Sequence, residues 1–248
     1  TLLEDDHFLC LVDLPGYGLS DKPRGDHRYT IADDARLLDE LVRTTFGLDR
    51  FTLVTHDRGD SVGLAFLDRA RREGAPYDVT GLVVLNGNVW LPLAQLTRIQ
   101  KALLNDVTGP PLSRLLPTRA FARGLARRTC TPPLDVEETA AIEGMLAHQD
   151  GMRVQHQLIQ YLRERRVHES SWLESLASGP VPVAVVWGEL DTIAPPRVAD
   201  FVWEQHLRDR AAPSAYWRVP GANHYPQLDQ PGVVAELLRA MPWTDPGR

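Results

Sequence analysis

The sequence has 248 residues, of which 43% are hydrophobic and 24% charged, a composition typical of a globular protein with one sizeable core. Its net charge is −6, and its arginines are interleaved with acidic residues, so no basic block indicates nucleic-acid binding. No apolar stretch approaches the roughly 20 residues that a membrane span needs. The two cysteines, Cys10 and Cys130, have neither metal-site nor redox spacing, which favours a reducing, cytoplasmic location.

Short runs rich in valine and leucine alternate with longer segments of helical periodicity. This pattern is typical of βαβ units that build a parallel sheet, so the sequence predicts an α/β fold. Helices are expected over residues 31–46 and 61–73. Strands are expected at Phe8–Val12, Phe51–Thr55, Gly81–Leu85, Val183–Trp187 and Ala215–Val219.

The alternation stops at about residue 90 and resumes after residue 172. In between, helix-like stretches are separated by prolines and no strand-like run occurs. We expect a helical cap at 90–172, inserted into a core formed by 1–89 and 173–248. The chain enters its first strand-like run without an initiator methionine, so we also expect core strands upstream of Thr1.

Each predicted strand ends in a turn that carries polar residues. Because ligands of open α/β sheets bind at the carboxyl ends of the strands, these turns are expected to share one crevice. Three of the residues suit catalysis and lie after three successive strands: Asp57, Asp191 and His224. Each alone has a simpler explanation, such as a helix cap or a turn residue, but the three together favour a catalytic site.

Two residues compete as the nucleophile. Gly59, Ser61 and Gly63 match the pattern G-x-S-x-G, which would make Ser61 a serine nucleophile. The preceding strand ends at Thr55 or His56, however, so the sharp strand-to-helix turn falls on Asp57. Ser61 would then lie one helical turn further on and face inward. The sequence therefore favours Asp57.

Several strings resemble α/β-hydrolases of the epoxide hydrolase and haloalkane dehalogenase type. They are DLPGYGLSDKP, THDRGD, GELDTIAP and HYPQL. The strings HDRGDSV, LVVLNG, LIQYLRERR, WLESLAS and NHYPQLDQP most resemble the mesoderm-specific transcript branch. The resemblance implies an α/β-hydrolase fold with a helical cap. It also implies that Asp57 is the nucleophile, Asp191 the acid and His224 the base.

The sequence departs from the pattern of each subfamily. The family's His-Gly oxyanion motif has no counterpart before the first predicted strand, and haloalkane dehalogenases carry tryptophan where this chain has Arg58. Epoxide hydrolases use two cap tyrosines, of which only Tyr161 lies near a suitable place. Fluoroacetate dehalogenases share the Asp-Arg pair, but their second arginine falls at Ser61. Some dehalogenases place the acid one strand earlier, where this chain has asparagines, so Asp191 is the better acid.

A carboxylate nucleophile suits displacement at a saturated carbon, which leaves an alkyl ester on the enzyme. We therefore expect a hydrolase of a small epoxide or alkyl halide that needs no metal or other cofactor. Arg58, Trp90 and Tyr161 are candidate substrate-binding residues, although each could instead serve packing or a structural ion pair. The expected partner is a small-molecule substrate, and a homodimer is an assembly that the fold class would allow.

Two alternatives remain open from the sequence. Ser61 could serve a carboxylic ester hydrolase, or the chain could be a non-catalytic hydrolase scaffold that binds a ligand. The missing oxyanion motif motivates the second alternative, because losing one oxyanion donor costs on the order of a hundredfold in rate.

Overall fold

The computed structural model describes residues 2–241, and the predicted core residues 242–248 lie outside that range. Four parallel strands form one sheet in the order β1-β2-β3-β4. They confirm four of the five predicted strands and the predicted α/β class. The strands are β1 (Arg50–His56), β2 (Asp78–Leu85), β3 (Val183–Gly188) and β4 (Ser214–Val219).

The fifth predicted strand, Phe8–Val12, is wrong. Residues 7–14 form an extended loop, and Phe8 and Leu11 are each 83% exposed. A strand is stable only when its backbone groups pair with a neighbouring strand. Within residues 2–241 no segment pairs with this run, so its apolar composition alone does not make it a strand.

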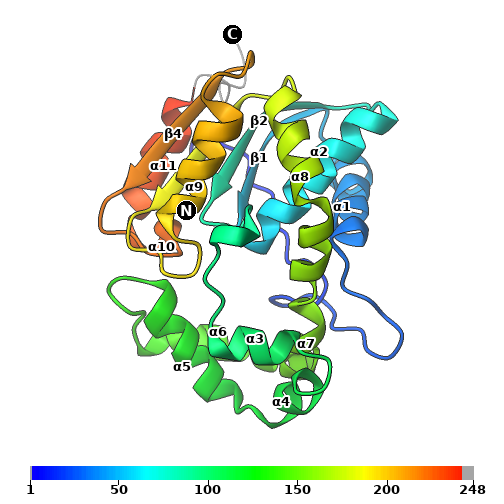
Figure 1. The fold of residues 1–248 in the computed structure, drawn as a ribbon, viewed down its shortest axis with the longest axis vertical. Coiled ribbons are helices and arrows are strands. Elements are labelled where there is room, and N and C mark those ends of the chain that lie inside the picture. Colours follow the sequence, from blue (N-terminus) through cyan, green and yellow to red (C-terminus); the bar gives the residue numbers. More distant parts are fainter. Residues whose placement is uncertain (1, 242–248) are drawn as a thin grey trace.

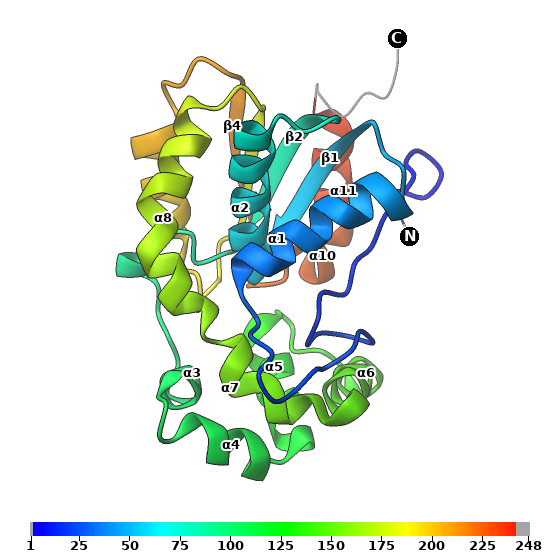
Figure 2. The same cartoon turned by 90° about the vertical axis from the view of Figure 1, so that its right-hand side faces the viewer.

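Helices cover both faces of the sheet (Figures 1 and 2). They are α1 (Ile31–Glu40), α2 (Arg58–Glu73), α8 (Tyr161–Ser178), α9 (Pro196–Val202), α10 (Pro226–Asp229) and α11 (Pro231–Ala240).

Side chains of β3 and of the second half of β2 alternate between two apolar clusters, because successive residues of a strand point to opposite faces. Leu82, Val84 and Val185 join the cluster under α1, α2, α8 and α9, whereas Val83 and Val186 join the one under α11.

A second group of helices faces the carboxyl ends of the strands, at the bottom of Figure 1. The helix α8 leads from this group back along the sheet, and the predicted cap boundary at residue 172 falls inside it. Among residues 2–241 no helix combines the length and apolarity needed to cross a bilayer. The group comprises α3 (Arg98–Leu104), α4 (Gly109–Leu115), α5 (Thr118–Thr129), α6 (Val136–Ala147) and α7 (Gln155–Leu158).

Candidate active site

Asp57 occupies the sharp turn between β1 and α2. Its backbone has φ 50° and ψ −113°, a conformation that a residue with a side chain adopts only when its surroundings impose it. The turn is tight because α2 packs directly on β1: a Cβ atom at Gly63 would lie 2.6 Å from Cγ2 of Thr55. The strand, turn and helix therefore hold the Asp57 carboxylate at the carboxyl end of the sheet.

Asp191 lies in the turn after β3 and is held by hydrogen bonds to both carboxylate oxygens. Its Oδ1 accepts from the backbone N–H groups of Ile193 (2.7 Å) and Ala194 (3.0 Å). Its Oδ2 accepts from Nδ2 of Asn86 (2.8 Å) and contacts Nδ1 of His224 at 2.8 Å. This set of bonds fixes both the carboxylate and the face of the imidazole that it meets.

His224 follows β4 and joins the other two predicted residues. Its Nε2 lies 3.7 Å from Oδ2 of Asp57, slightly beyond hydrogen-bond length but within ion-pair distance. The side chain of His224 is 3% exposed, whereas that of Asp57 is 36% exposed. The structure thus brings Asp57, Asp191 and His224 together, with only Asp57 open to a ligand.

The two carboxylates change the charge state of the imidazole. Burial alone would lower the pKa of His224, but the hydrogen bond to Asp191 and the nearby charge of Asp57 raise it to about 10. Burial would raise the pKa of Asp57, but adjacent His224 outweighs this and leaves it lowered. At neutral pH the pair is therefore an imidazolium beside a carboxylate.

His56, the residue before the elbow, supports His224 from behind. Its Nε2 lies 2.7 Å from the backbone carbonyl oxygen of His224, and the two rings are 5.0 Å apart. Burial lowers the pKa of His56 to about 4, so its imidazole is neutral and donates to that carbonyl. His56 therefore forms a structural hydrogen bond behind the elbow.

Asn86 was noted in the sequence only as a residue at an alternative acid position. In the structure it is fully buried and has φ 41°, and its Oδ1 accepts from the N–H of Gly188 (2.9 Å). Its amide therefore connects the ends of β2 and β3 and orients Asp191. The signal that could have found it is an amide at the end of a buried strand, where an unpaired polar group is costly.

Arg58 forms an ion pair with Asp34 of α1, not with Asp60 in its own helix. Its Nη2 lies 2.5 Å from Oδ2 of Asp34, and both side chains are buried. The guanidinium carbon is 5.4 Å from the ring of Tyr17 and 5.8 Å from the ring of Tyr161. The buried side chain of Arg58 therefore lies next to one acid and two tyrosines, of which Tyr161 is buried and Tyr17 partly buried.

Both tyrosines have raised pKa values. Burial and the charge of Asp57 raise the pKa of Tyr161 well above its usual value, and burial raises that of Tyr17 to about 12. Both phenols therefore remain protonated at neutral pH. Tyr17, which lies in the loop after residue 14, was not predicted as a site residue because its contacts come from chain segments far away.

Trp90 lies away from this group. Its ring stacks on Phe201 of α9, with centroids 4.7 Å apart and an interplanar angle of 13°. It packs against the larger apolar cluster of the sheet. Of the two roles considered from the sequence, this arrangement favours core packing over substrate contact.

Ser61, the competing nucleophile, is fully buried on the first turns of α2. Its Oγ accepts a hydrogen bond from Nη2 of Arg165, a buried arginine on α8. A substrate carbonyl could reach Ser61 only by displacing this guanidinium. The geometry therefore favours Asp57 over Ser61.

A buried carboxylate lies beside the elbow as well. Burial raises the pKa of Asp60 well above its usual value, although the charge of Arg165 lowers it. Asp60 fills the space that a side chain at position 87 would need, since a Cβ atom at Gly87 would lie 1.8 Å from Oδ2 of Asp60. The same Cβ atom would lie 2.9 Å from the backbone oxygen of Asp57, so Gly87 lets the turn after β2 approach the elbow closely.

Comparisons with known proteins identify the family and the fold of this chain. Residues 1–231 match the family described as alpha/beta hydrolase fold. "Putative hydrolase LipZ" of Mycobacterium tuberculosis is 36% identical over 231 residues, which cover 93% of this chain and 77% of that protein. The mesoderm-specific transcript protein of Mus musculus is 29% identical over 243 residues, covering 91% and 67% of the two chains.

A solved structure shows the same fold. Haloalkane dehalogenase DbeA from Bradyrhizobium elkani USDA94 has a TM-score of 0.71 and 22% sequence identity. The match covers 91% of this chain and 77% of that chain. At this level of identity the likeness concerns the fold alone, so the chemistry has to be argued from the residues of the site.

Proposed function

Because this chain belongs to the α/β-hydrolase fold family, we propose that it hydrolyses a small, largely apolar epoxide or alkyl halide through a covalent ester on Asp57. One observation carries the proposal: the residue at the strained turn is a carboxylate, and its Oδ2 lies 3.7 Å from Nε2 of His224. An ionised carboxylate needs no base to become a nucleophile, so the histidine is available for a later step.

In the first step an oxygen of Asp57 attacks a saturated carbon of the substrate. A C–O bond forms to the enzyme while the bond to the leaving group breaks, and its electron pair departs on halide or on the epoxide oxygen. The lowered pKa of Asp57 keeps the carboxylate ionised for this attack. The product is a neutral alkyl ester.

In the second step the imidazolium of His224 first loses its proton, to the group that protonated an epoxide oxygen or, after departure of a halide, to solvent. The neutral imidazole then takes a proton from water, and the resulting hydroxide attacks the carbonyl carbon of the ester. Collapse of the tetrahedral intermediate releases the alcohol and regenerates the carboxylate. Esterification removes one of the two negative charges that raise the pKa of His224, so its pKa falls when a base is needed. Asp191 then stabilises the imidazolium that forms.

The intermediate carries an oxyanion that needs hydrogen-bond donors. The first N–H groups of a helix have no partner within the helix, and α2 begins at Arg58. The backbone N–H of Arg58 is therefore a suitable donor, independent of its side chain.

Two protonated phenols favour an epoxide over a halide. An alkoxide is a poor leaving group that must receive a proton, whereas a halide leaves without one. Tyr17 and Tyr161 stay protonated at neutral pH, and the charge of Asp57 contributes to the raised pKa of each. Either hydroxyl could donate the proton to the epoxide oxygen, and the guanidinium of Arg58, near both rings, would stabilise the resulting phenolate.

The test is a single turnover in heavy-oxygen water with an epoxide such as styrene oxide. We expect the label in the peptide that contains Asp57, because water attacks the ester carbonyl there. His224→Gln should trap the ester, seen as a stoichiometric mass increase on that peptide. Asp57→Asn should lower turnover on the order of a millionfold, as removal of a nucleophile does.

Ser61→Ala is the matched control. On its own it should still place the label in the Asp57 peptide, and combined with His224→Gln it should still trap the ester. Label found only in the diol would contradict the covalent mechanism. Ester hydrolysis that is lost in Ser61→Ala and kept in Asp57→Asn would instead support a serine esterase. If epoxides, halides and esters were all left unchanged, a non-catalytic binding protein would be the better description.

A further inference from the structure

A pocket of about 760 Å³ opens between α8 and the segment that runs from residue 91 to α3. This volume lies within the usual range of small-molecule sites, about 300 to 1,000 Å³. None of Asp57, Asp191 or His224 lines it. The pocket is therefore separate from the site of the proposed chemistry.

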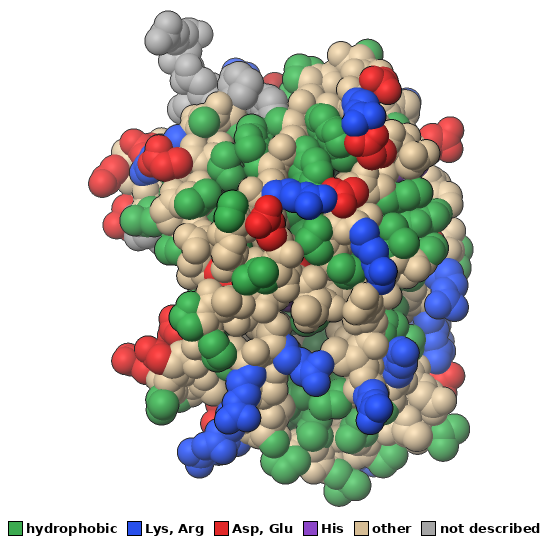
Figure 3. Space-filling model, turned by 60° about the vertical axis from the view of Figure 1, so that its left-hand side comes forward, with side chains coloured by type: hydrophobic (Ala, Val, Ile, Leu, Met, Phe, Trp, Pro, Cys, Tyr) green, Lys and Arg blue, Asp and Glu red, His purple; other side chains and the backbone are tan. Residues whose placement is uncertain are grey.

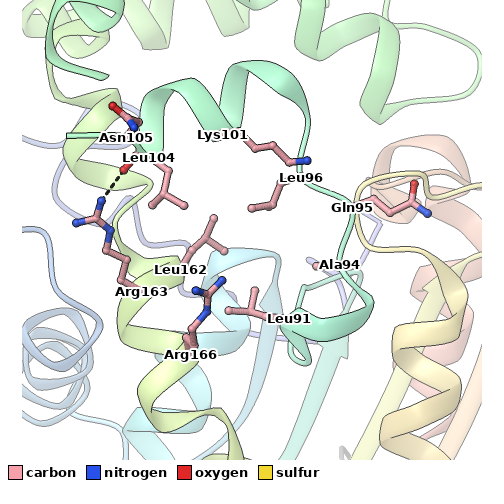
Figure 4. A pocket seen from close by; sticks show the side chains of 10 residues that line it. All are labelled: Leu91, Ala94, Gln95, Leu96, Lys101, Leu104, Asn105, Leu162, Arg163 and Arg166. Carbon is pink, nitrogen blue, oxygen red and sulfur yellow. Dashed lines mark hydrogen bonds between the residues drawn. The ribbon is translucent and has the colours of Figure 1, made fainter. Parts of the chain in front are cut away.

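The floor of the pocket is apolar. Four leucines point toward one another across the opening in Figure 4, where Arg166 extends along the same opening. An alkyl chain that covers such a surface is stabilised there, because apolar area of both partners is removed from water. The four are Leu91, Leu96, Leu104 and Leu162.

The rim of the pocket is basic and has no acidic residue. Of its three cations, Arg163 is already bound, because its Nη2 donates to the carbonyl oxygen of Leu104 (2.8 Å) and pairs with Asp106 (3.0 Å). Within residues 2–241 the side chains of Lys101 and Arg166 form no ion pair or hydrogen bond. Two unpaired cations thus stand beside an apolar floor.

The surrounding helices add to this positive charge. The interleaving of basic and acidic residues expected for the whole chain fails at 91–130, which holds seven basic residues and one acidic residue. This segment has a net charge of +6 in a chain of net charge −6. In Figure 3 lysine and arginine side chains gather over the lower half of the molecule, around a hollow. Such a field draws anions toward the pocket.

We propose that this pocket binds an anionic amphiphile, an alkyl chain that ends in a carboxylate or a phosphate. The chain would cover the four leucines, and the head would accept charge-assisted hydrogen bonds from Lys101 and Arg166. The helix α8 places this site next to the elbow, because Leu162 and Arg166 line the pocket while Tyr161 and Arg165, one position earlier, face Arg58 and Ser61.

Titration calorimetry with dodecanoate tests the proposal on the wild-type chain and on Asp57→Asn, which should bind equally well. Lys101→Gln/Arg166→Gln should raise Kd about tenfold or more, through loss of two charge-assisted contacts. The control pair Arg98→Gln/Arg114→Gln removes the same charge from α3 and α4, at positions that do not line the pocket. It should change Kd by less than about twofold, since exposed charges contribute little. Hexanoate should bind more weakly than dodecanoate.

The source of the anion is distinguished by a second arm. Dodecyl phosphate and dodecanoate represent free amphiphiles, and vesicles of phosphatidylcholine with phosphatidylglycerol represent a lipid headgroup. Binding by either source supports the proposal if the pocket pair weakens it far more than the control pair does. Equal effects of the two pairs, dodecanol binding as tightly as dodecanoate, or no binding in either arm would overturn it. Because binding does not need Asp57, this result is independent of the proposed reaction.

Discussion

The two sides of the candidate active site hold their buried charge in different ways. On the acid side, Asp191 is contacted by four hydrogen-bond donors, including Asn86 and His224. On the elbow side, the carboxylate oxygens of Asp60 and two nitrogens of Arg165 have no hydrogen bond to a described residue. The acid side is therefore fixed by directional bonds before substrate arrives, whereas the elbow side depends on charge acting over longer distances.

Among variants that keep the nucleophile, the largest effect is expected on the acid side. Asp191→Asn keeps the shape of the side chain but removes the charge that stabilises the imidazolium. The rate of ester hydrolysis should fall on the order of ten-thousandfold, as for other triads that lose this charge. Alkylation of Asp57 should persist, so the ester should accumulate, as rapid-quench mass spectrometry would reveal.

A second variant tests whether the acid can come from the neighbouring strand. The side chains of Asn86 and His224 both hydrogen-bond to Oδ2 of Asp191. Asp191→Asn/Asn86→Asp should therefore recover about tenfold in rate over Asp191→Asn, a gain of about 1.4 kcal/mol. No recovery would mean that only the turn after β3 can orient the histidine.

A smaller effect, on stability, is expected on the elbow side. Arg165→Met leaves Asp60 and Glu169 buried without their nearest cation, and breaking such an arrangement costs about 3 to 5 kcal/mol of unfolding free energy. Urea denaturation measures the loss. Arg163→Met, two residues earlier in the same helix, removes an exposed pair with Asp106 and should cost less than about 1 kcal/mol.

The double variant Arg165→Met/Asp60→Asn sharpens this contrast. It removes both charges, so it should be more stable than Arg165→Met alone. If it were equally unstable, the loss would come from packing against Trp172, whose ring lies 5.7 Å from the guanidinium carbon.

The smallest effect, counted for each pH unit, is the change of unfolding free energy with pH. The pKa of His224 is raised from 6.5 to about 10 by its two carboxylates. Its contribution is therefore complete below about pH 6.5 and is lost as the pH rises toward 10, with a slope of at most about 1.4 kcal/mol per pH unit. Asp57→Asn removes one carboxylate and so lowers the pKa of folded His224. The loss of stability with rising pH should therefore end at a lower pH and be smaller in total. An unchanged upper end of this pH range would show that Asp57 does not act on His224.

Much of the fold could be predicted because the buried strands are short, rich in valine and leucine, and followed by polar turns. The elbow register followed from the same pattern, since the end of β1 fixes the position of Asp57. The run Phe8–Val12 has the right composition but lacks a neighbouring strand among the described residues, and composition cannot report pairing. Residues placed by distant contacts were also missed.

Arg165 is the clearest of these. It lies in the string LRERRVHE, where nothing indicates which arginine turns inward, and its partner Ser61 is 104 residues away. The spacing of Tyr161, Arg165, Glu169 and Trp172 marks one face of a helix. From sequence alone the arginine and glutamate on that face would be predicted to be exposed, because these residues are rarely buried.

The close approach of Gly87 to Asp60 has an evolutionary consequence. The carboxylate occupies the volume of the missing side chain, so positions 60 and 87 are expected to change together among relatives. A relative with a small residue at the position of Asp60 would lose the closer of the two contacts that exclude alanine at the position of Gly87. In this chain, alanine at position 87 would clash with the carboxylate of Asp60 and with the backbone oxygen of Asp57. Asp60 takes no part in the proposed reaction, yet it restricts which residues can lie next to the elbow at position 87.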